Sequence, residues 1–262
     1  MPPADPEQYR ATSRASWADA AGAWGTYRHV IQAAGEPVSH WMVDAIDPQP
    51  GHRVLELAAG PGDTGLLAAE LIEPGGTLIS SDAVEEMVDV ARARAAELGI
   101  TNVEFRTIDA EWIDLPTADV DGVLARWGYM LLAAWADPEE NPWSFAPRAE
   151  LVAMGAMQPP APDAPDMFAL SDPQRIVGLL EETGFGDIVV EQLPIVYRYA
   201  SLDDWWDTSL EISASLARGV VALTPAQRDD LRDAVDARLA RYVADDGAVA
   251  LPGLTHVAAA GA

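Results

Sequence analysis

The segment ELAAGPGDTG, which runs from Glu56 to Gly65, joins a carboxylate to a glycine-rich turn. Its last six residues follow the pattern G-x-G-x-x-G, which is typical of a turn that holds the pyrophosphate of a dinucleotide. Glu56 stands four residues before the first of these glycines, and a negative charge is an unexpected neighbour for phosphates. The turn therefore holds either a dinucleotide or another adenosine compound that favours a nearby anion.

Two more carboxylates follow at a similar spacing. Asp82 lies 26 residues after Glu56, and Asp109 lies 27 residues after Asp82. Each stands at or near the end of a segment that we expect to be a strand. The carboxyl ends of parallel strands line the ligand crevice of an open sheet. One acid at such a position is unremarkable, whereas three on successive strands are a more specific signal of a binding site.

S-Adenosylmethionine is a compound whose parts suit these three acids. It carries an adenine, a ribose with two free hydroxyls, a sulfonium and a methionine end, and it has no phosphate. Glu56 would help to hold the turn and the ammonium group, usually through water. Asp82 would accept both ribose hydroxyls, and Asp109 would accept from the adenine amino group.

Three motifs between residues 51 and 132 resemble those of the class I S-adenosylmethionine-dependent methyltransferases. The first, acid-x-G-x-G-x-G in that family, here starts at Glu56 and has Ala58 in place of its first glycine. The second is Ser-Asp-Ala at 81–83 with Met87, and the third is Asp-Ala-Glu at 109–111. The chain most resembles the small-molecule group that includes the ubiquinone/menaquinone-biosynthesis C-methyltransferases.

The resemblance implies S-adenosylmethionine as cofactor, methyl transfer to a small, partly apolar molecule, and a seven-stranded sheet whose last strand is antiparallel. The cofactor-binding residues that it implies are Glu56, Ala58, Gly60, Gly62, Asp82, Ala83, Met87, Asp109, Ala110 and Arg126.

Residues for the acceptor side are harder to identify. In methyl transfer the leaving group is a neutral thioether, so the reaction needs alignment and a dry site rather than an acid. The catalytic residue is therefore unknown, with His29, Trp127 and Tyr129 as candidates. Aromatic side chains near the sulfonium would add cation–π attraction. The candidates for lining the acceptor site, for which packing in the core is the alternative, are Trp24, Tyr27, Trp127 and Trp205.

Two other functions stay open. Asp82 lies 20 residues after Gly62, a spacing that also suits the ribose of a nicotinamide dinucleotide in an NAD-dependent oxidoreductase. That function leaves Glu56 and the acidic turn at 109–111 without a role. A non-catalytic protein that binds an adenosine ligand is the other alternative.

Predicted strands and helices alternate through the middle of the chain, which favours an α/β, Rossmann-like sheet with helices on both faces. We expect one structural domain made of an N-terminal helical lid (1–50), a cofactor-binding core (51–200), a helical cap (201–246) and a last strand with a tail (247–262). Capping boxes at 171–174 and 224–227 predict two helix starts.

The family pattern breaks after Leu132. Strand four should lead into a helix before strand five, but here the chain passes directly to what looks like the exit of strand five. Parallel neighbours cannot be joined by so short a link. Either residues are missing at this point, or the chain lacks the crossover; we favour the second, with strand four pairing beside the final strand.

Composition narrows the class of partner. The 262 residues carry a net charge of −26, and every basic residue is Arg. This charge disfavours nucleic acids and anionic membrane surfaces as partners. The chain has no cysteine and no apolar run long enough for a transmembrane helix, and from its polar, acidic start we expect no secretory signal, so we expect a cytoplasmic protein. No spacing of His, Asp or Glu indicates a metal site, and the oligomeric state cannot be predicted.

Overall fold

A computed structural model describes residues 6–125, 133–159 and 166–261. The chain divides into two compact units. The first comprises Met1–Arg28 and Met42–Met130, and the second comprises His29–Trp41 and Leu131–Ala262.

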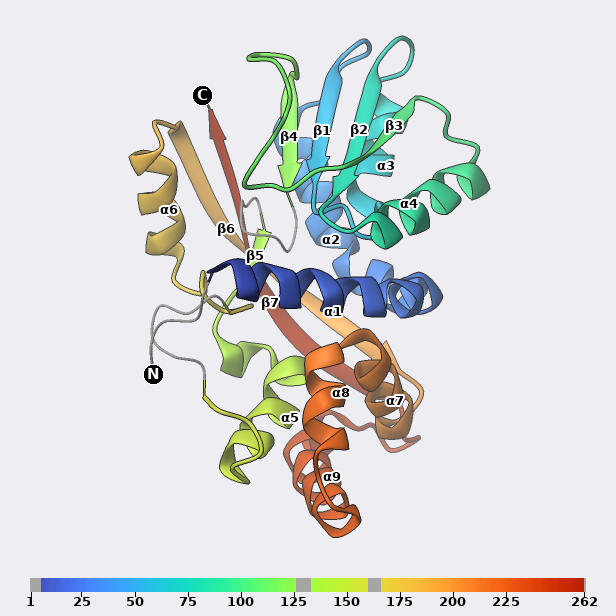
Figure 1. Ribbon diagram of the computed structural model, residues 1–262, viewed down its shortest axis with the longest axis vertical. Coiled ribbons are helices and arrows are strands. Elements are labelled where there is room, and N and C mark those ends of the chain that lie inside the picture. The colour runs from blue at the N-terminus through green and yellow to red at the C-terminus, as the bar shows by residue number, and fades with distance from the viewer. Residues whose placement is uncertain (1–5, 126–132, 160–165, 262) are drawn as a thin grey trace. The chain divides into compact units, whose positions relative to one another are not determined.

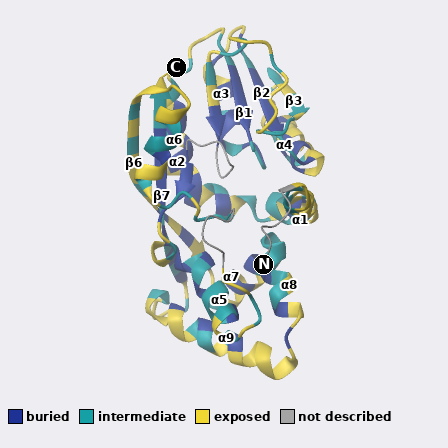
Figure 2. Cartoon of the chain, turned by 60° about the vertical axis from the view of Figure 1, so that its left-hand side comes forward, coloured by how far each residue is buried: buried dark blue, intermediate teal, exposed yellow. Residues whose placement is uncertain are grey.

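The first unit contains a four-stranded parallel sheet (Figure 1). Its strands are β1 (Arg53–Leu57), β2 (Thr77–Asp82), β3 (Val103–Thr107) and β4 (Gly122–Ala125), in the order β3-β2-β1-β4. Residues 54–57 and 78–81 are buried, as expected of strands covered on both faces (Figure 2). The predicted parallel sheet of an α/β, Rossmann-like fold is confirmed.

Helices connect the first three strands. They are α3 (Asp63–Leu71), between β1 and β2, and α4 (Glu85–Leu98), between β2 and β3. Each helix packs against the two strands that it joins, which is the βαβ arrangement that parallel pairing requires. Gly99 ends α4 in the left-handed conformation (φ 73°), a backbone shape that glycine adopts without a steric cost.

The N-terminal residues form two helices, as predicted. They are α1 (Pro6–Thr26) and α2 (Arg28–Ile46), and residues 29–41 of α2 group with the second unit. Helix α1 packs against α4, where Ala21 meets the buried side chains of Val84 and Met87. This contact fixes α1 beside the carboxyl end of β2.

The second unit contains a three-stranded sheet. Strand β7 (Val249–Gly261) lies between β5 (Ala133–Trp135) and β6 (Gly186–Tyr199) and is antiparallel to both, so an antiparallel last strand is confirmed. The helices of this unit are α5 (Pro142–Ala153), α6 (Pro173–Glu182), α7 (Leu202–Ile212), α8 (Ala214–Val221) and α9 (Pro225–Leu239), with the short 3₁₀ helices η1 (Pro138–Glu140) and η2 (Ala240–Tyr242).

Two helix starts in this unit test the predicted capping boxes. Thr224 and Gln227 form the complete reciprocal box at the start of α9. At α6 the prediction was wrong: Asp172, not Ser171, is the N-cap, and its carboxylate accepts from the backbone N–H of Gln174. The carboxylate of Asp172 is one residue closer to Pro173, which occupies the first helical position.

The sheet arrangement departs from the seven-stranded sheet that the resemblance implied. The described strands form a four-stranded parallel sheet and a three-stranded antiparallel one. Strand β5 pairs with β7, and β4 pairs with β1, so the suggestion that strand four pairs beside the final strand was wrong. The link between β4 and β5 is residues 126–132, which is too short for the crossover that parallel neighbours need. The junction itself lies outside the described residues.

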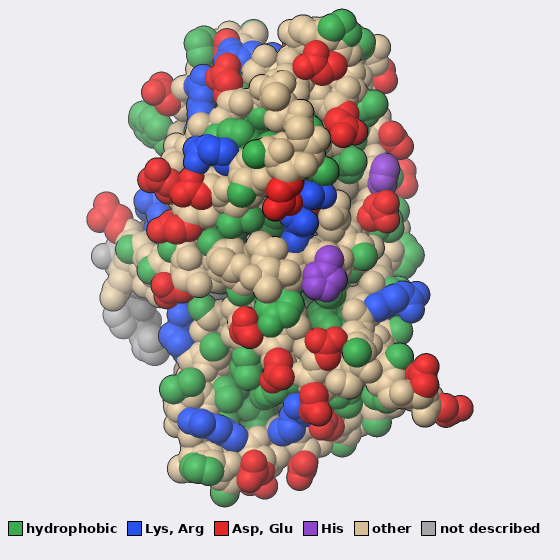
Figure 3. Space-filling view, turned by 90° about the vertical axis from the view of Figure 1, so that its right-hand side faces the viewer, with side chains coloured by type: hydrophobic (Ala, Val, Ile, Leu, Met, Phe, Trp, Pro, Cys, Tyr) green, Lys and Arg blue, Asp and Glu red, His purple; other side chains and the backbone are tan. Residues whose placement is uncertain are grey.

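The distribution of surface charge and the hydropathy of the helices are the last features of the fold. Acidic side chains are spread over the face shown in Figure 3 and are interspersed with arginines. None of the helices in the described ranges is long and apolar enough to cross a membrane.

Candidate functional site

A tight turn follows β1 at the carboxyl edge of the parallel sheet. Its backbone passes through positive φ angles at Ala58 (50°), Gly60 (53°) and Gly62 (83°) before α3 begins at Asp63. Glycine adopts such angles freely, whereas alanine does so at a cost of about 1 kcal/mol. Ala58 therefore keeps the left-handed backbone expected of a glycine at this position of the family motif. The Ala59 N–H donates to the Ser81 carbonyl at 2.9 Å, which joins the turn to β2.

Glu56 is buried beneath this turn, with 2% of its surface exposed. Its Oε1 accepts from the backbone N–H of Gly65, in the first turn of α3, at 2.7 Å. Its Oε2 accepts from the Ser80 hydroxyl at 3.3 Å. A carboxylate at the N-terminus of a helix is favoured by the helix dipole. The predicted role of Glu56 in holding the turn matches this geometry, while its role toward an ammonium group stays a prediction.

The approach of Glu56 explains why Gly65 is a glycine. A Cβ at this position would lie 2.2 Å from Oε2 of Glu56 and 2.6 Å from its Cδ, distances that no real contact allows. The sequence motif includes Gly65, but it does not show why a glycine is needed there, because the contacting residue, Glu56, lies on β1 and not on α3.

Asp82 ends β2 and faces the turn. Its Oδ2 accepts from the Gly60 N–H at 3.0 Å, and its Oδ1 accepts from the Val84 N–H at 3.1 Å. Burial raises the pKa of Asp82 above the ordinary value, while hydrogen bonds from the backbone of Gly60, Val84 and Ala83 act in the opposite direction. Two carboxylate oxygens offer about four lone-pair sites, so Asp82 keeps acceptor capacity for a ligand.

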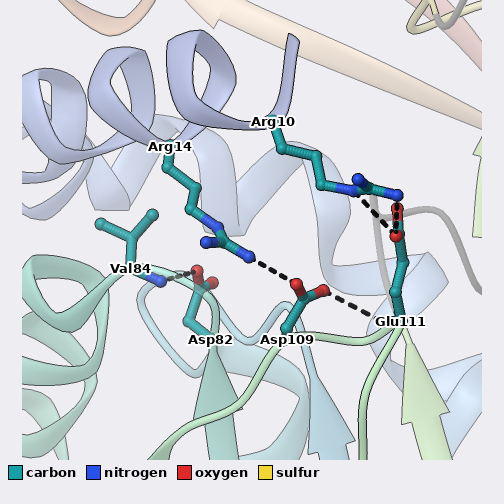
Figure 4. A network of polar contacts seen from close by, with 6 residues as sticks. All are labelled: Arg10, Arg14, Asp82, Val84, Asp109 and Glu111. Atoms are coloured by element: carbon teal, nitrogen blue, oxygen red, sulfur yellow. Dashed lines mark hydrogen bonds and ion pairs between the residues drawn. The ribbon is translucent and has the colours of Figure 1, made fainter. Parts of the chain in front are cut away.

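Asp109 and Glu111 follow β3 and are joined to α1 (Figure 4). Oδ1 of Asp109 accepts from the Glu111 N–H at 3.0 Å, and its Oδ2 accepts from the Arg14 guanidinium. Arg10 binds Oε2 of Glu111 through Nη2 at 2.7 Å and Nε at 2.9 Å. Sequence reasoning missed both arginines, although their spacing of four residues placed them on one face of a helix.

The other candidates for cofactor contact among the described residues are apolar. Met87 is buried in the cluster that joins α4 to α1, and Trp24 of α1 packs against the same cluster at partial exposure. Ala83 is half-buried, and Ala110 packs against the interior of the sheet beside Leu57. Trp24 is thus the predicted acceptor-lining residue that the structure brings beside a predicted cofactor residue.

The remaining candidates are dispersed. Tyr27 lies between α1 and α2 in the first unit, whereas His29 and Trp205 belong to the second. Trp205 is fully buried against Trp206, with ring centroids 5.9 Å apart, as in core packing. His29 lines an open hollow of about 350 Å³ beside Arg198. The predicted candidates that lie outside the described residues are Arg126, Trp127 and Tyr129.

A metal site is a separate question. Among the residues that the structure describes, no group of three or more His, Asp or Glu side chains could hold a metal ion.

Together, the parallel sheet, the glycine turn and acids at or near the carboxyl ends of three neighbouring strands define a Rossmann-like domain suited to an adenosine compound. Residues 48–140 match the family model described as a methyltransferase domain. This segment is a class I S-adenosylmethionine-dependent methyltransferase domain.

Curated relatives that are named as methyltransferases match part of the chain. Nocamycin O-methyltransferase of Saccharothrix syringae is 37% identical over 89 residues, which cover 34% of this chain and 32% of the relative. Aklanonic acid methyltransferase DauC of Streptomyces sp. is 30% identical over 96 residues, 37% of this chain and 44% of the relative. The ubiquinone/menaquinone biosynthesis C-methyltransferase UbiE of Pseudomonas fluorescens is 37% identical over 79 residues, 30% and 31% of the two chains. The chain thus spans less than half the length of these relatives.

Proposed function

We propose that the protein transfers a methyl group from S-adenosylmethionine to a small, partly apolar molecule by in-line displacement. The observation that carries the proposal is the hydrogen bond from the Gly60 N–H to Oδ2 of Asp82. It joins the end of β2 to the glycine turn after β1, so the acid proposed for the ribose lies beside the turn proposed for the methionine end. Matches to relatives named for nocamycin and aklanonic acid support a small organic acceptor.

The roles of individual residues follow from chemistry and geometry. Asp82 would accept the two ribose hydroxyls through its remaining lone pairs, and Asp109 would accept from the adenine amino group. Glu56 would hold the turn from below, so that backbone N–H groups of the turn receive the methionine part. These assignments need no pyrophosphate, which distinguishes the proposed ligand from a dinucleotide.

The acceptor side would act by positioning. The departing thioether is neutral, so the protein needs to align the nucleophile with the methyl group, exclude water and remove a proton where the nucleophile carries one. Trp24 is the aromatic residue best supported for contact with ligand in the first unit, because it packs beside Met87. The cytoplasmic location expected from the composition stays a prediction.

Calorimetry with three ligands tests the proposal. We expect binding of S-adenosylmethionine and S-adenosylhomocysteine and no binding of NAD. Asp82→Asn should weaken S-adenosylhomocysteine binding by about tenfold or more, because an acceptor bonded to hydroxyls loses its charge. Asp89→Asn is the matched control, since Asp89 is an exposed acid whose partner, Arg92, lies on the same helix.

The outcomes separate the possible functions. Binding of NAD alone would contradict the proposal in favour of an oxidoreductase. Binding of S-adenosylmethionine without turnover of any small acceptor, tested by release of S-adenosylhomocysteine, would leave a non-catalytic adenosine-binding protein. Equal affinity of wild type and Asp82→Asn would remove the ribose role from Asp82.

A further inference from the structure

Helix α1 places two arginines over the acids that follow β3. Arg10 and Arg14 are four residues apart, so they project from one face of the helix. Arg14 meets Asp109 and Arg10 meets Glu111, across sequence separations of 95 and 101 residues (Figure 4). The two ion pairs therefore connect α1 to the loop proposed to receive adenine.

The carboxylate of Asp109 is engaged on both oxygens. Its Oδ1 accepts from the Glu111 N–H at 3.0 Å, a bond that shapes the loop itself. Its Oδ2 is held by the Arg14 guanidinium. An adenine amino group that donates to Asp109 meets an oxygen that already has a charged partner, and it must displace or share that partner.

We propose that Arg14 competes with the adenine of the cofactor for Asp109 and thereby sets cofactor affinity. This inference rests on the proposed function, which gives Asp109 its contact with adenine. Cofactor entry then releases one of the two ion pairs that join α1 to the loop, so binding and the position of α1 are coupled.

The exposure of the partners sets the size of the effect. The side chains of Arg14 and Asp109 are 50% and 32% exposed, and those of Arg10 and Glu111 are 41% and 52% exposed. Ion pairs at this exposure shift an equilibrium by up to about fivefold. Such a pair can be displaced by a ligand, and its loss is still measurable.

The test is calorimetric titration of wild type and Arg14→Gln with S-adenosylhomocysteine. We expect Arg14→Gln to bind about two- to fivefold more tightly at low salt, because the carboxylate is freed. Added NaCl should bring the ratio of the two affinities toward one, since salt screens the wild-type ion pair. Glutamine is a good helix former, so α1 should persist, and Arg14→Ala serves as a second variant.

Two further variants isolate the cause. Arg92→Gln removes the same charge from the same unit, and the ion pair of Arg92 stays within α4 with Asp89, so its affinity should equal that of wild type. Arg10→Gln loosens α1 without freeing Asp109, and its effect should be smaller than that of Arg14→Gln. Equal effects of Arg10→Gln and Arg14→Gln would overturn direct competition.

The remaining outcomes also decide. Weaker or unchanged binding by a folded Arg14→Gln, while wild type binds, would overturn this inference and leave the proposed function intact. Absence of S-adenosylhomocysteine binding by wild type and every variant would remove the proposed function, and the inference with it.

Discussion

Each unit holds a polar side chain at a structural junction, but the hydrogen bonds of the two side chains differ. In the first unit, Asp82 accepts two backbone hydrogen bonds, from Gly60 and Val84, and keeps lone pairs free. In the second, Asn141 is fully buried between η1 and α5. Its Nδ2 lies within hydrogen-bond distance of three carbonyls, those of Ala136, Asp137 and Leu254.

The acceptor side of Asn141 is also occupied. Its Oδ1 accepts from the Leu254 N–H and from Nε1 of Trp143, both at 3.2 Å. Trp143 in turn packs against Trp135 and Tyr197, each with ring centroids 4.8 Å away. An amide with all its capacity used can bind nothing further, whereas a carboxylate with lone pairs to spare can. The contrast teaches that remaining hydrogen-bond capacity distinguishes Asp82, the proposed binding residue, from Asn141, the structural one.

The largest expected effect is on stability and concerns the close contact between Glu56 and Gly65 in the first unit. Gly65→Ala places a Cβ against the buried carboxylate of Glu56 and should lower the free energy of unfolding by about 3 kcal/mol. Urea unfolding measures the change. Gly178→Ala is the control, because nothing lies within 4 Å of its added Cβ. In the interior of α6, the control should raise stability by up to about 1 kcal/mol; an equal loss for both would contradict the account of Gly65.

Removing the side chain of Asn141 in the second unit should lower the stability by a smaller amount. Asn141→Ala removes the acceptor of the Leu254 N–H and of the Trp143 indole, which should lower the free energy of unfolding by about 2 kcal/mol. Asn102→Ala, in the first unit, removes a half-buried amide whose Nδ2 donates to the Ala69 carbonyl at 2.8 Å. Its loss should be about 1 kcal/mol. Urea unfolding that ranks Asn102→Ala above Asn141→Ala would contradict the role given to Asn141.

The smallest expected effect is a pH dependence of ligand binding that arises from Asp82. Because the pKa of Asp82 is raised in the folded protein, its carboxylate takes up a proton at a higher pH than the ordinary value of about 3.9. Acidification through this raised pKa should weaken S-adenosylhomocysteine binding, since the protonated group loses acceptor capacity. Asp82→Asn has no such proton and should show no such step in calorimetric titrations across pH.

Stability should change in the opposite direction over the same pH range. A raised folded-state pKa contributes stability that is present below the unfolded pKa and lost as pH rises through the folded pKa. Wild type should therefore gain stability relative to Asp82→Asn on acidification, as measured by urea unfolding. A constant difference between the two proteins would show that the pKa of Asp82 is not raised.

Much of the first unit was predictable because its signals are local. Glu56 and Asp82 stand at the ends of short apolar segments, and the glycines between them have a fixed spacing, so period and turn chemistry located them. Arg10 and Arg14 were not found, because their partners lie 101 and 95 residues away and a helix surface shows many charges without partners. Ser171 and Asp172 are both favoured N-cap residue types, so residue type alone could not decide which of them caps α6.

The division into two sheets was only half predictable. The short link after β4 predicted that strands four and five could not be parallel neighbours. Where each strand would pair instead depended on β6 and β7, which are long antiparallel partners formed from distant parts of the sequence. Which of these distant segments pair depends on tertiary packing, and the local sequence pattern of each strand does not predict it.

Ala58 carries a last consequence. Its backbone adopts the glycine-like shape although its side chain does not favour it, so the contacts around the turn offset the cost of that shape. Pattern searches that insist on glycine there would pass over proteins of this kind.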